Sequence, residues 1–275
     1  MKLISWNVWE GGGNRIETIL GVLRDVDADI VALQECNGWL DRPQKEDDDK
    51  RGEESIFEDV QQRLGYAYGE LGRGTIRGSG KRYNVVLFSK ELPLSSHCVE
   101  GMHHAALLAE YRSSLGSLSV VTAHLDPNDP AIRKSELEKI ILLLRDSQND
   151  IIVGDLNALS HQDSYDVDMS LLSRGLRDCF VRNGNISREE TKLLSIAGFD
   201  DVAVMFGKDN KHTMPTHASK YQDGFSCRVD YCWVRGGITP RITSYDVIRE
   251  VRTNTASDHY PIVVEIDAKL LPDEE

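Results

Sequence analysis

The sequence predicts an α/β protein in which two β-sheets pack face to face and helices flank them. Strand-like apolar runs alternate with segments of helical periodicity along most of the 275 residues. One stretch, ALLAEYRSSLGSLSVVTAHLD, is typical of two antiparallel strands joined by the turn SSLGS, so hairpins form part of the sheets. No linker rich in Pro, Gly or Ser divides the chain, and we therefore expect a single domain over residues 1–275.

The first segments predict a strand, a helix and a second strand. KLISWNV, residues 2–8, has the alternation of a strand. Asn14 and Glu17 have the spacing of a capping box, so a helix is expected to begin there. DIVALQE, residues 29–35, has an apolar centre that indicates a strand buried on both faces.

A strongly charged segment, residues 41–54, is predicted to be a surface loop because it has too few apolar side chains to pack. Ser55 and Glu58 form a second capping box, and Gly65 is expected to end the helix that follows. YNVVLFSK, residues 83–90, is predicted to be the next strand.

The second half continues this alternation. Residues 131–147 indicate an amphipathic helix, and Ser187 with Glu190 begins another short one. Three further segments are predicted to be strands: DIIVGDLN, RVDYCWV and HYPIVVEI.

The net charge of −13 has the wrong sign for a protein that binds duplex DNA by neutralising phosphates. Tight non-specific binding to nucleic acid is therefore disfavoured. An enzyme whose metal ions supply the local positive charge remains compatible with this composition.

The five cysteines are scattered and form no CxxC motif, so we expect buried, reduced thiols. No apolar run approaches the roughly 20 residues that span a bilayer, and MKLISWNV lacks the apolar region of a signal peptide. We therefore expect a cytoplasmic protein without stable membrane association. No obligate protein partner is indicated.

Polar residues collect at the ends of the predicted strands, where an open α/β structure builds its site. Each one alone is more often a cap or a turn residue. Together they supply carboxylates, amides and imidazoles, and no Ser or Cys is placed as a nucleophile. The set is Asn7, Glu35, Asn84, His124, Asp155, Asn157, Asp230, Asp258 and His259.

The order Asn7, LQE, Asn84, HL, GDLN, RVDY and SDH resembles that of the endonuclease/exonuclease/phosphatase superfamily. This superfamily includes pancreatic-type deoxyribonucleases, apurinic-site endonucleases, neutral sphingomyelinases and inositol polyphosphate 5-phosphatases. The resemblance extends from Asn7 to His259. It implies a four-layered α/β/β/α sandwich of two mixed, mainly antiparallel sheets, and magnesium-dependent hydrolysis of a phosphate ester.

The resemblance also implies a metal site. Mg²⁺ prefers hard oxygen donors, with Mn²⁺ as the alternative ion, and Glu35 is the first choice as its ligand. Asn7 and Asp258 are expected to complete the site directly or through water.

The remaining residues are assigned to catalysis. His259 is expected to donate to a phosphate oxygen, and by family position Asp230 orients it. Asp155 is expected to be the general base or to orient the attacking water, with Asn157 positioning phosphate or water. His124 is expected to contact phosphate and to share acid or base work.

Three further positions are assigned to substrate binding. Asn84 is either a substrate-binding residue or a polar residue of an edge strand. Arg73 and Arg77 lie in a basic, Gly-rich segment before Asn84, which is either a phosphate clamp or a solvated loop. His103 and His104 fall outside the motif order and are expected to have a packing role.

Two departures bear on the branch of the superfamily. Trp9 stands where apurinic-site endonucleases carry an acidic residue, and His124 stands where they carry Asn. Abasic-site repair is therefore disfavoured. The leading hypothesis is a phosphodiesterase acting on nucleic acid or a nucleotide-type substrate. The alternatives are a phosphomonoesterase, a lipid- or inositol-headgroup phosphoesterase, and a non-catalytic binding module on the same fold.

Overall fold

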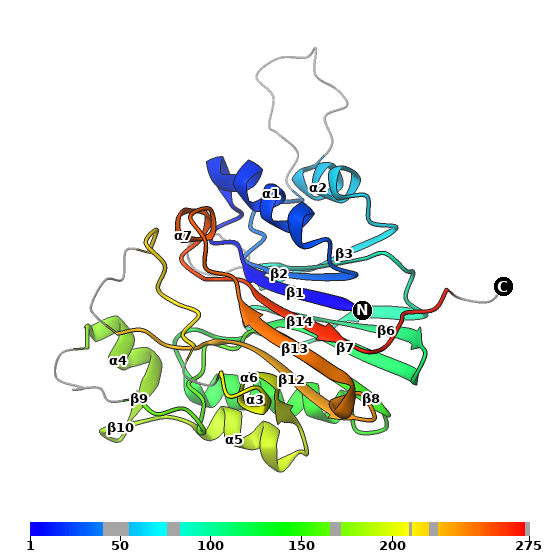
Figure 1. The fold of residues 1–275 in the computed structure, drawn as a ribbon. Helices are drawn as coiled ribbons and strands as arrows, with labels where there is room; N and C mark the ends of the chain where they lie inside the picture. The colour runs from blue at the N-terminus through cyan, green and yellow to red at the C-terminus, as the bar shows by residue number, and fades with distance from the viewer. Residues whose placement is uncertain (41–54, 76–82, 166–171, 209–210, 220–224, 273–275) are drawn as a thin grey trace.

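Two six-stranded sheets pack face to face, and helices cover their outer faces (Figure 1). This computed structural model describes residues 1–40, 55–75, 83–165, 172–208, 211–219 and 225–272. The arrangement confirms the four-layered α/β/β/α sandwich. The predicted surface loop at residues 41–54 lies outside the described residues.

The first sheet joins the two ends of the chain, because the first strand pairs with the last in antiparallel fashion. The first strand also pairs in parallel with the second, and the remaining pairs in this sheet are antiparallel. Its spatial order is β13 (Ile242–Val247), β14 (Ile262–Ile266), β1 (Lys2–Asn7), β2 (Ile30–Gln34), β4 (Val85–Ser89) and β3 (Tyr68–Gly72).

The second sheet contains the predicted hairpin, in which β6 and β7 are antiparallel and Ser113 pairs with Gly116 at the turn. β7 and β8 are parallel, and the other pairs are antiparallel. Its order is β11 (Asp200–Asp201), β12 (Asp230–Gly236), β8 (Asn149–Asp155), β7 (Gly116–His124), β6 (Ala105–Ser113) and β5 (Ser95–Cys98). A separate ribbon pairs β9 (Val181–Arg182) with β10 (Asn185–Ile186).

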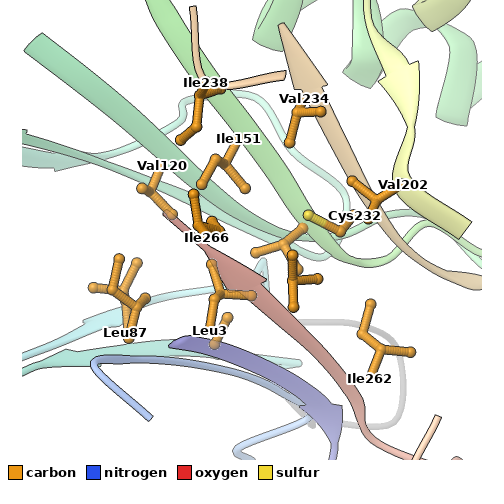
Figure 2. Packing of buried hydrophobic residues seen from close by; sticks show 14 of the residues in the cluster. Leu3, Leu87, Val120, Ile151, Val202, Cys232, Val234, Ile238, Ile262 and Ile266 are labelled. Carbon is orange, nitrogen blue, oxygen red and sulfur yellow. The ribbon is translucent and has the colours of Figure 1, made fainter. Parts of the chain in front are cut away.

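The main core lies between the two sheets. Figure 2 shows Leu3 and Leu87 of the first sheet pointing toward Val120 and Ile151 of the second. Their sequence neighbours point the other way: Ile4 packs under the helices on the outer face of the first sheet. Successive side chains of a strand alternate between the two faces of its sheet. A strand that is apolar on both faces therefore packs against the other sheet on one side and against the helices on the other.

Helices cover the outer faces. α1 (Ile16–Val26), α2 (Ile56–Leu64) and α7 (Thr253–Ala256) lie on the first sheet, and α3 (Pro130–Leu143) and α5 (Glu189–Ile196) on the second. The shorter helices are α4 (Arg174–Phe180), α6 (Val202–Met205), η1 (Gly13–Arg15) and η3 (Thr239–Arg241). None of the helices in the described ranges is long and apolar enough to cross a membrane.

The two predicted capping boxes have different outcomes. Ser55 and Glu58 form theirs, and Gly65 ends α2 in a left-handed conformation. The box of Asn14 and Glu17 is wrong, because Asn14 lies inside η1 and α1 begins after Arg15 without a side-chain cap.

Several boundaries and elements also differ from prediction. α3 begins at Pro130, capped by Asp129, and ends at Leu143 rather than at residue 147. The strands β3, β5, β11 and β13 and the helix α4 were not predicted, because their short or polar sequences carry little periodicity.

Candidate active site

The strand register brings polar residues of the second sheet to one edge. His124 ends β7 and pairs with Asp155 at the end of parallel β8, while Asp230 begins antiparallel β12 and also pairs with Asp155. In the first sheet, Asn7 ends β1 and Glu35 directly follows β2. At one edge of a sheet, a strand ends together with its parallel neighbour, and its antiparallel neighbour begins. His124, Asp155 and Asp230 therefore lie at one edge of the second sheet. Asn7 and Glu35 lie at the edge of the first sheet at the same end of the sandwich.

Asp155 is at the centre of this group and is almost fully buried. Its Oδ2 lies 3.0 Å from Asn7 Nδ2, 3.5 Å from His124 Nε2 and 3.8 Å from His259 Nε2. Its Oδ1 accepts a hydrogen bond of 2.9 Å from the backbone N–H of Asn157. One carboxylate therefore contacts or faces residues from three other segments of the chain, in addition to its own neighbour Asn157.

His259 is held by its backbone and by its ring. Its carbonyl accepts a 2.9 Å hydrogen bond from Trp6 Nε1, and its Nδ1 lies 2.8 Å from Asp230 Oδ2. Burial lowers the pKa of His259, but the carboxylates of Asp230 and Asp155 outweigh burial and raise this pKa well above the ordinary value. This direction favours the imidazolium form, in which Nδ1–H donates to Asp230 and Nε2–H faces Asp155.

Glu35 is fixed by the glycine-containing loop that follows β1. Its backbone is left-handed, with a φ of 58°, and its Oε2 accepts a 2.9 Å hydrogen bond from the N–H of Glu10. Gly11 donates its N–H to the Glu35 carbonyl at 2.7 Å. A Cβ on Gly11 would lie 2.3 Å from the Asn37 carbonyl oxygen, so only glycine allows this loop to close around Glu35.

The donor set fits a hard divalent cation. Burial, and then the carboxylate of Asp258, raise the pKa of Glu35 to about 7, and burial raises the pKa of Asp258 as well. Arg15 is close to both, but its guanidinium donates to the carbonyls of Trp9 and Ala256. Within the described residues no Lys or Arg forms an ion pair with Glu35 or Asp258, and a bound cation would supply the missing charge.

A second cluster could also hold an ion. Ligand atoms of Asp155, Asp230 and His259 lie within 4.8 Å of one another, and all three residues are buried. Because Mg²⁺ prefers hard oxygen donors to imidazole nitrogen, the carboxylates of Glu35 and Asp258 are the better match for this ion.

A pocket of about 430 Å³ opens over these residues. Six of the residues proposed from the sequence line it: Glu35, His124, Asp155, Asn157, Asp258 and His259. Asn7 and Asp230 do not line the pocket, and they support it through their hydrogen bonds to Asp155 and His259.

The two predicted substrate-binding residues that the structure describes, Asn84 and Arg73, do not line this pocket. Asn84 is buried, where its Oδ1 accepts from the N–H of Gly74 at 3.1 Å and its Nδ2 donates to the Cys36 carbonyl at 3.4 Å. Arg73 is exposed and does not line the pocket. Arg77 lies outside the described residues.

Sequence reasoning missed part of the lining. His104 is buried as a packing role requires, but it also lines the pocket, and its Nδ1 is 3.2 Å from His124 Nε2. The ring of Tyr83 stacks on His104 at 4.5 Å between centroids. The helix α4 adds Leu176 and Phe180. No local pattern separates these residues from ordinary core residues.

Comparison with known families agrees with this geometry. A model of the endonuclease/exonuclease/phosphatase family matches residues 4–259. The chain belongs to this family. It is therefore a hydrolase of phosphate esters, and the family in general depends on divalent metal ions. No protein with a curated description matches the chain.

Solved structures share the family fold at low sequence identity. An AP endonuclease from Archaeoglobus fulgidus has a TM-score of 0.70 and 19% identity over 97% of this chain and 99% of its own. A family protein from Leptotrichia buccalis has a TM-score of 0.69 and 16% sequence identity, over 97% of this chain and 99% of its own. The catalytic domain of Xenopus laevis APE2 has a TM-score of 0.65 and 18% sequence identity, over 100% of this chain and 94% of its own. At these identities the likeness establishes the fold of the chain and not its substrate.

Proposed function

We propose that the protein is a Mg²⁺-dependent phosphodiesterase, with Mn²⁺ as the alternative ion, acting on nucleic acid or a nucleotide-type substrate. The observation that carries the proposal is the position of Asp155 Oδ2, between 3.0 and 3.8 Å from polar nitrogens of Asn7, His124 and His259. An acceptor and several donors converge at the floor of one pocket, as in-line attack of water on phosphorus requires.

Asp155 acts as the general base in this proposal. As a water oxygen bonds to phosphorus, Asp155 Oδ2 takes a proton from the water, and the ester P–O bond on the opposite side breaks. The leaving alcohol departs as an alkoxide or phenoxide and receives its proton from solvent or from a histidine of the pocket. Asn157 N–H holds the other carboxylate oxygen at 2.9 Å and so fixes the direction of Oδ2.

His259 stabilises the charge on the non-bridging phosphate oxygens. Its Nε2 faces Asp155 Oδ2 at 3.8 Å, on the pocket side of a ring whose Nδ1 is held by Asp230 at 2.8 Å, and would donate to a phosphate oxygen bound there. His124 faces the same space through its Nε2. Glu35 and Asp258, with Asn7 beside them, would hold the metal, which when bound polarises the phosphate and stabilises the leaving oxygen.

A panel of esters tests the proposal. The purified protein is offered bis-p-nitrophenyl phosphate, p-nitrophenyl phosphate, single- and double-stranded DNA, RNA and sphingomyelin, each with Mg²⁺, Mn²⁺ or chelator. We expect hydrolysis of the diester and of a nucleic acid, abolished by chelator. Preference for the monoester or for sphingomyelin would replace this proposal by one of the alternatives.

A matched pair of variants separates the site from a contaminating activity. His259→Ala is expected to lower kcat by about 10²–10⁴-fold, the usual range for an acid–base or charge-stabilising residue. His97→Ala, on the exposed side of the edge strand β5, is expected to keep wild-type kcat. Equal activity in the two variants would contradict the assignment of this pocket.

A further inference from the structure

His104 lies beside the residues proposed for catalysis but outside the order of family motifs. It directly precedes β6, and Ala105, the first residue of β6, pairs with His124 at the end of β7. His124 in turn pairs with Asp155 at the end of β8. Asp155, His124 and His104 therefore stand in a row along one edge of the second sheet, one strand apart, and all three line the pocket.

The two rings of this row are in direct contact. His104 Nδ1 lies 3.2 Å from His124 Nε2, and the ring centroids are 4.2 Å apart. Two ring nitrogens at this distance hold one hydrogen between them, in an N–H···N bond. The same His124 Nε2 lies 3.5 Å from Asp155 Oδ2. The carboxylate thus stands at one end of the row and His104 at the other.

This geometry directs a proton of His124 toward its neighbours and not toward a substrate. Its Nε2 faces Asp155 and His104, and its Nδ1 is buried. In-line displacement places the attacking water and the leaving oxygen on opposite sides of phosphorus. With Asp155 as the base, the leaving oxygen points away from Asp155. His104, at the far end of the row, is therefore the better placed of the two rings to donate to that oxygen.

The backbone next to His104 is fixed, as a positioned proton donor requires. The N–H of His103 donates to Glu136 Oε1 of α3 at 2.6 Å, and the His103 carbonyl accepts from Thr75 Oγ1 at 2.6 Å. Glu136 Oε2 accepts from the N–H of Asp126, just beyond the end of β7, at 2.9 Å. One buried carboxylate of α3 thus ties the segment before β6 to the segment after β7.

We propose that His104 is a catalytic residue that protonates the leaving oxygen, with His124 as its partner. The inference rests on the proposed phosphodiesterase function and adds a proton donor to it. As the ester P–O bond breaks, its electron pair stays on oxygen; the N–H bond at His104 Nε2 breaks, and its proton forms the O–H bond of the released alcohol. The imidazole pair, charged before this step, is neutral after it. The proton that Asp155 took from water, or one from solvent, restores the charge.

The need for this proton depends on the leaving group, and that dependence provides the test. p-Nitrophenolate is a stable anion and departs from bis-p-nitrophenyl phosphate without a proton. Phenolate is far more basic, as the pKa of about 10 for a tyrosine side chain indicates, so its departure from diphenyl phosphate requires a donor to be fast. Comparison of the two diesters separates proton donation from packing.

His104→Phe removes the proton and keeps a flat ring beside Tyr83, on which His104 stacks at 4.5 Å between centroids. It is expected to lower kcat for diphenyl phosphate by about 10²-fold or more. For bis-p-nitrophenyl phosphate only the hydrogen bond to His124 is lost, and kcat should fall by about tenfold or less. His103→Phe is the matched control, because His103 is half exposed and lies outside the pocket lining. It should change kcat for either ester by less than about twofold.

His104→Asn gives the same test if the Phe variant fails to fold, because an amide also lacks a transferable proton. Thermal unfolding of each variant checks that it is folded. Equal loss on both esters would assign His104 to positioning alone, and no loss on either would assign it to packing; both results overturn the proton donor and leave the phosphodiesterase intact. Wild-type protein that cleaves only the p-nitrophenyl ester would overturn the donor as well. Failure of the wild-type protein to cleave either ester with Mg²⁺ or Mn²⁺ would instead overturn the proposed function itself.

Discussion

Replacing Asp230 by Asn removes the charge that faces His259 and keeps the size of the side chain. The Asn oxygen is still able to accept from Nδ1–H, so the orientation of the ring is retained. What is lost is the ionic character of a 2.8 Å hydrogen bond between two buried groups.

The expected magnitude follows from that bond. A hydrogen bond to a charged group contributes roughly 1.5–3 kcal/mol. Each 1.36 kcal/mol of activation free energy changes the rate about tenfold. If the whole of this energy stabilises the imidazolium in the transition state, its loss lowers kcat by roughly 10- to 150-fold.

The loss should depend on pH. In the wild-type protein the carboxylates of Asp230 and Asp155 raise the pKa of His259, so the imidazolium persists as the pH increases. Asp230→Asn lowers this pKa, and the variant should lose activity at a lower pH on the alkaline side. Toward the acidic end of the range the imidazolium becomes more favoured in both proteins, so the difference in kcat should be smallest there.

The assay is kcat for bis-p-nitrophenyl phosphate from about pH 5.5 to about pH 9 at saturating Mg²⁺, a range that brackets the histidine pKa. Thermal unfolding of both proteins checks that the variant is folded. A loss of kcat that is equal at every pH, or no loss at all, would refute the assignment of His259 as an imidazolium donor held by Asp230.

Four further changes test other parts of the site and the fold. Asp155→Ala should lower kcat by about 10²–10⁴-fold, and wild-type turnover would remove it from the mechanism. Glu35→Gln should weaken Mg²⁺ binding in calorimetry by at least about tenfold; an unchanged affinity would place the metal elsewhere. Arg228→Met should lower the free energy of unfolding in urea by about 3–5 kcal/mol, because it leaves the buried carboxylates of Asp163 and Asp201 without their cation. Arg73→Ala should raise KM for single-stranded DNA by a larger factor than KM for the small diester. An equal change in both KM values would show that this residue does not bind the substrate.

Local rules predicted two capping boxes equally well, and only one of them forms. Ser55 and Glu58 are free to cap α2, whereas Glu17 pairs with Arg63 of α2 at 2.6 Å and Asn14 is inside a 3-10 turn. The difference comes from the neighbouring loop, which closes around Glu35 and sets where α1 can begin. A capping motif in the sequence does not predict that constraint, because it depends on Glu35 at the end of β2, more than ten residues along the chain from the start of α1.

The sequence by itself determined the layered α/β fold, because the pattern of apolar residues in each strand indicates whether one face or both faces of that strand are buried. It also determined that Asn7, His124, Asp155 and Asp230 stand at strand ends, and adjacent strands in register bring such residues to one edge. Their placement around one pocket is a property of the structure, and their catalytic roles stay predictions.

Only the tertiary structure decided what else surrounds that edge. Leu176 and Phe180 come from a short helix with no periodic signal, and His104 directly precedes β6, where the sequence pattern does not distinguish it from a core histidine. Their common position depends on contacts between segments that are far apart in the chain. Local propensity carries no information about such contacts, so the extent and charge of the pocket became visible only once the two sheets and α4 were packed together.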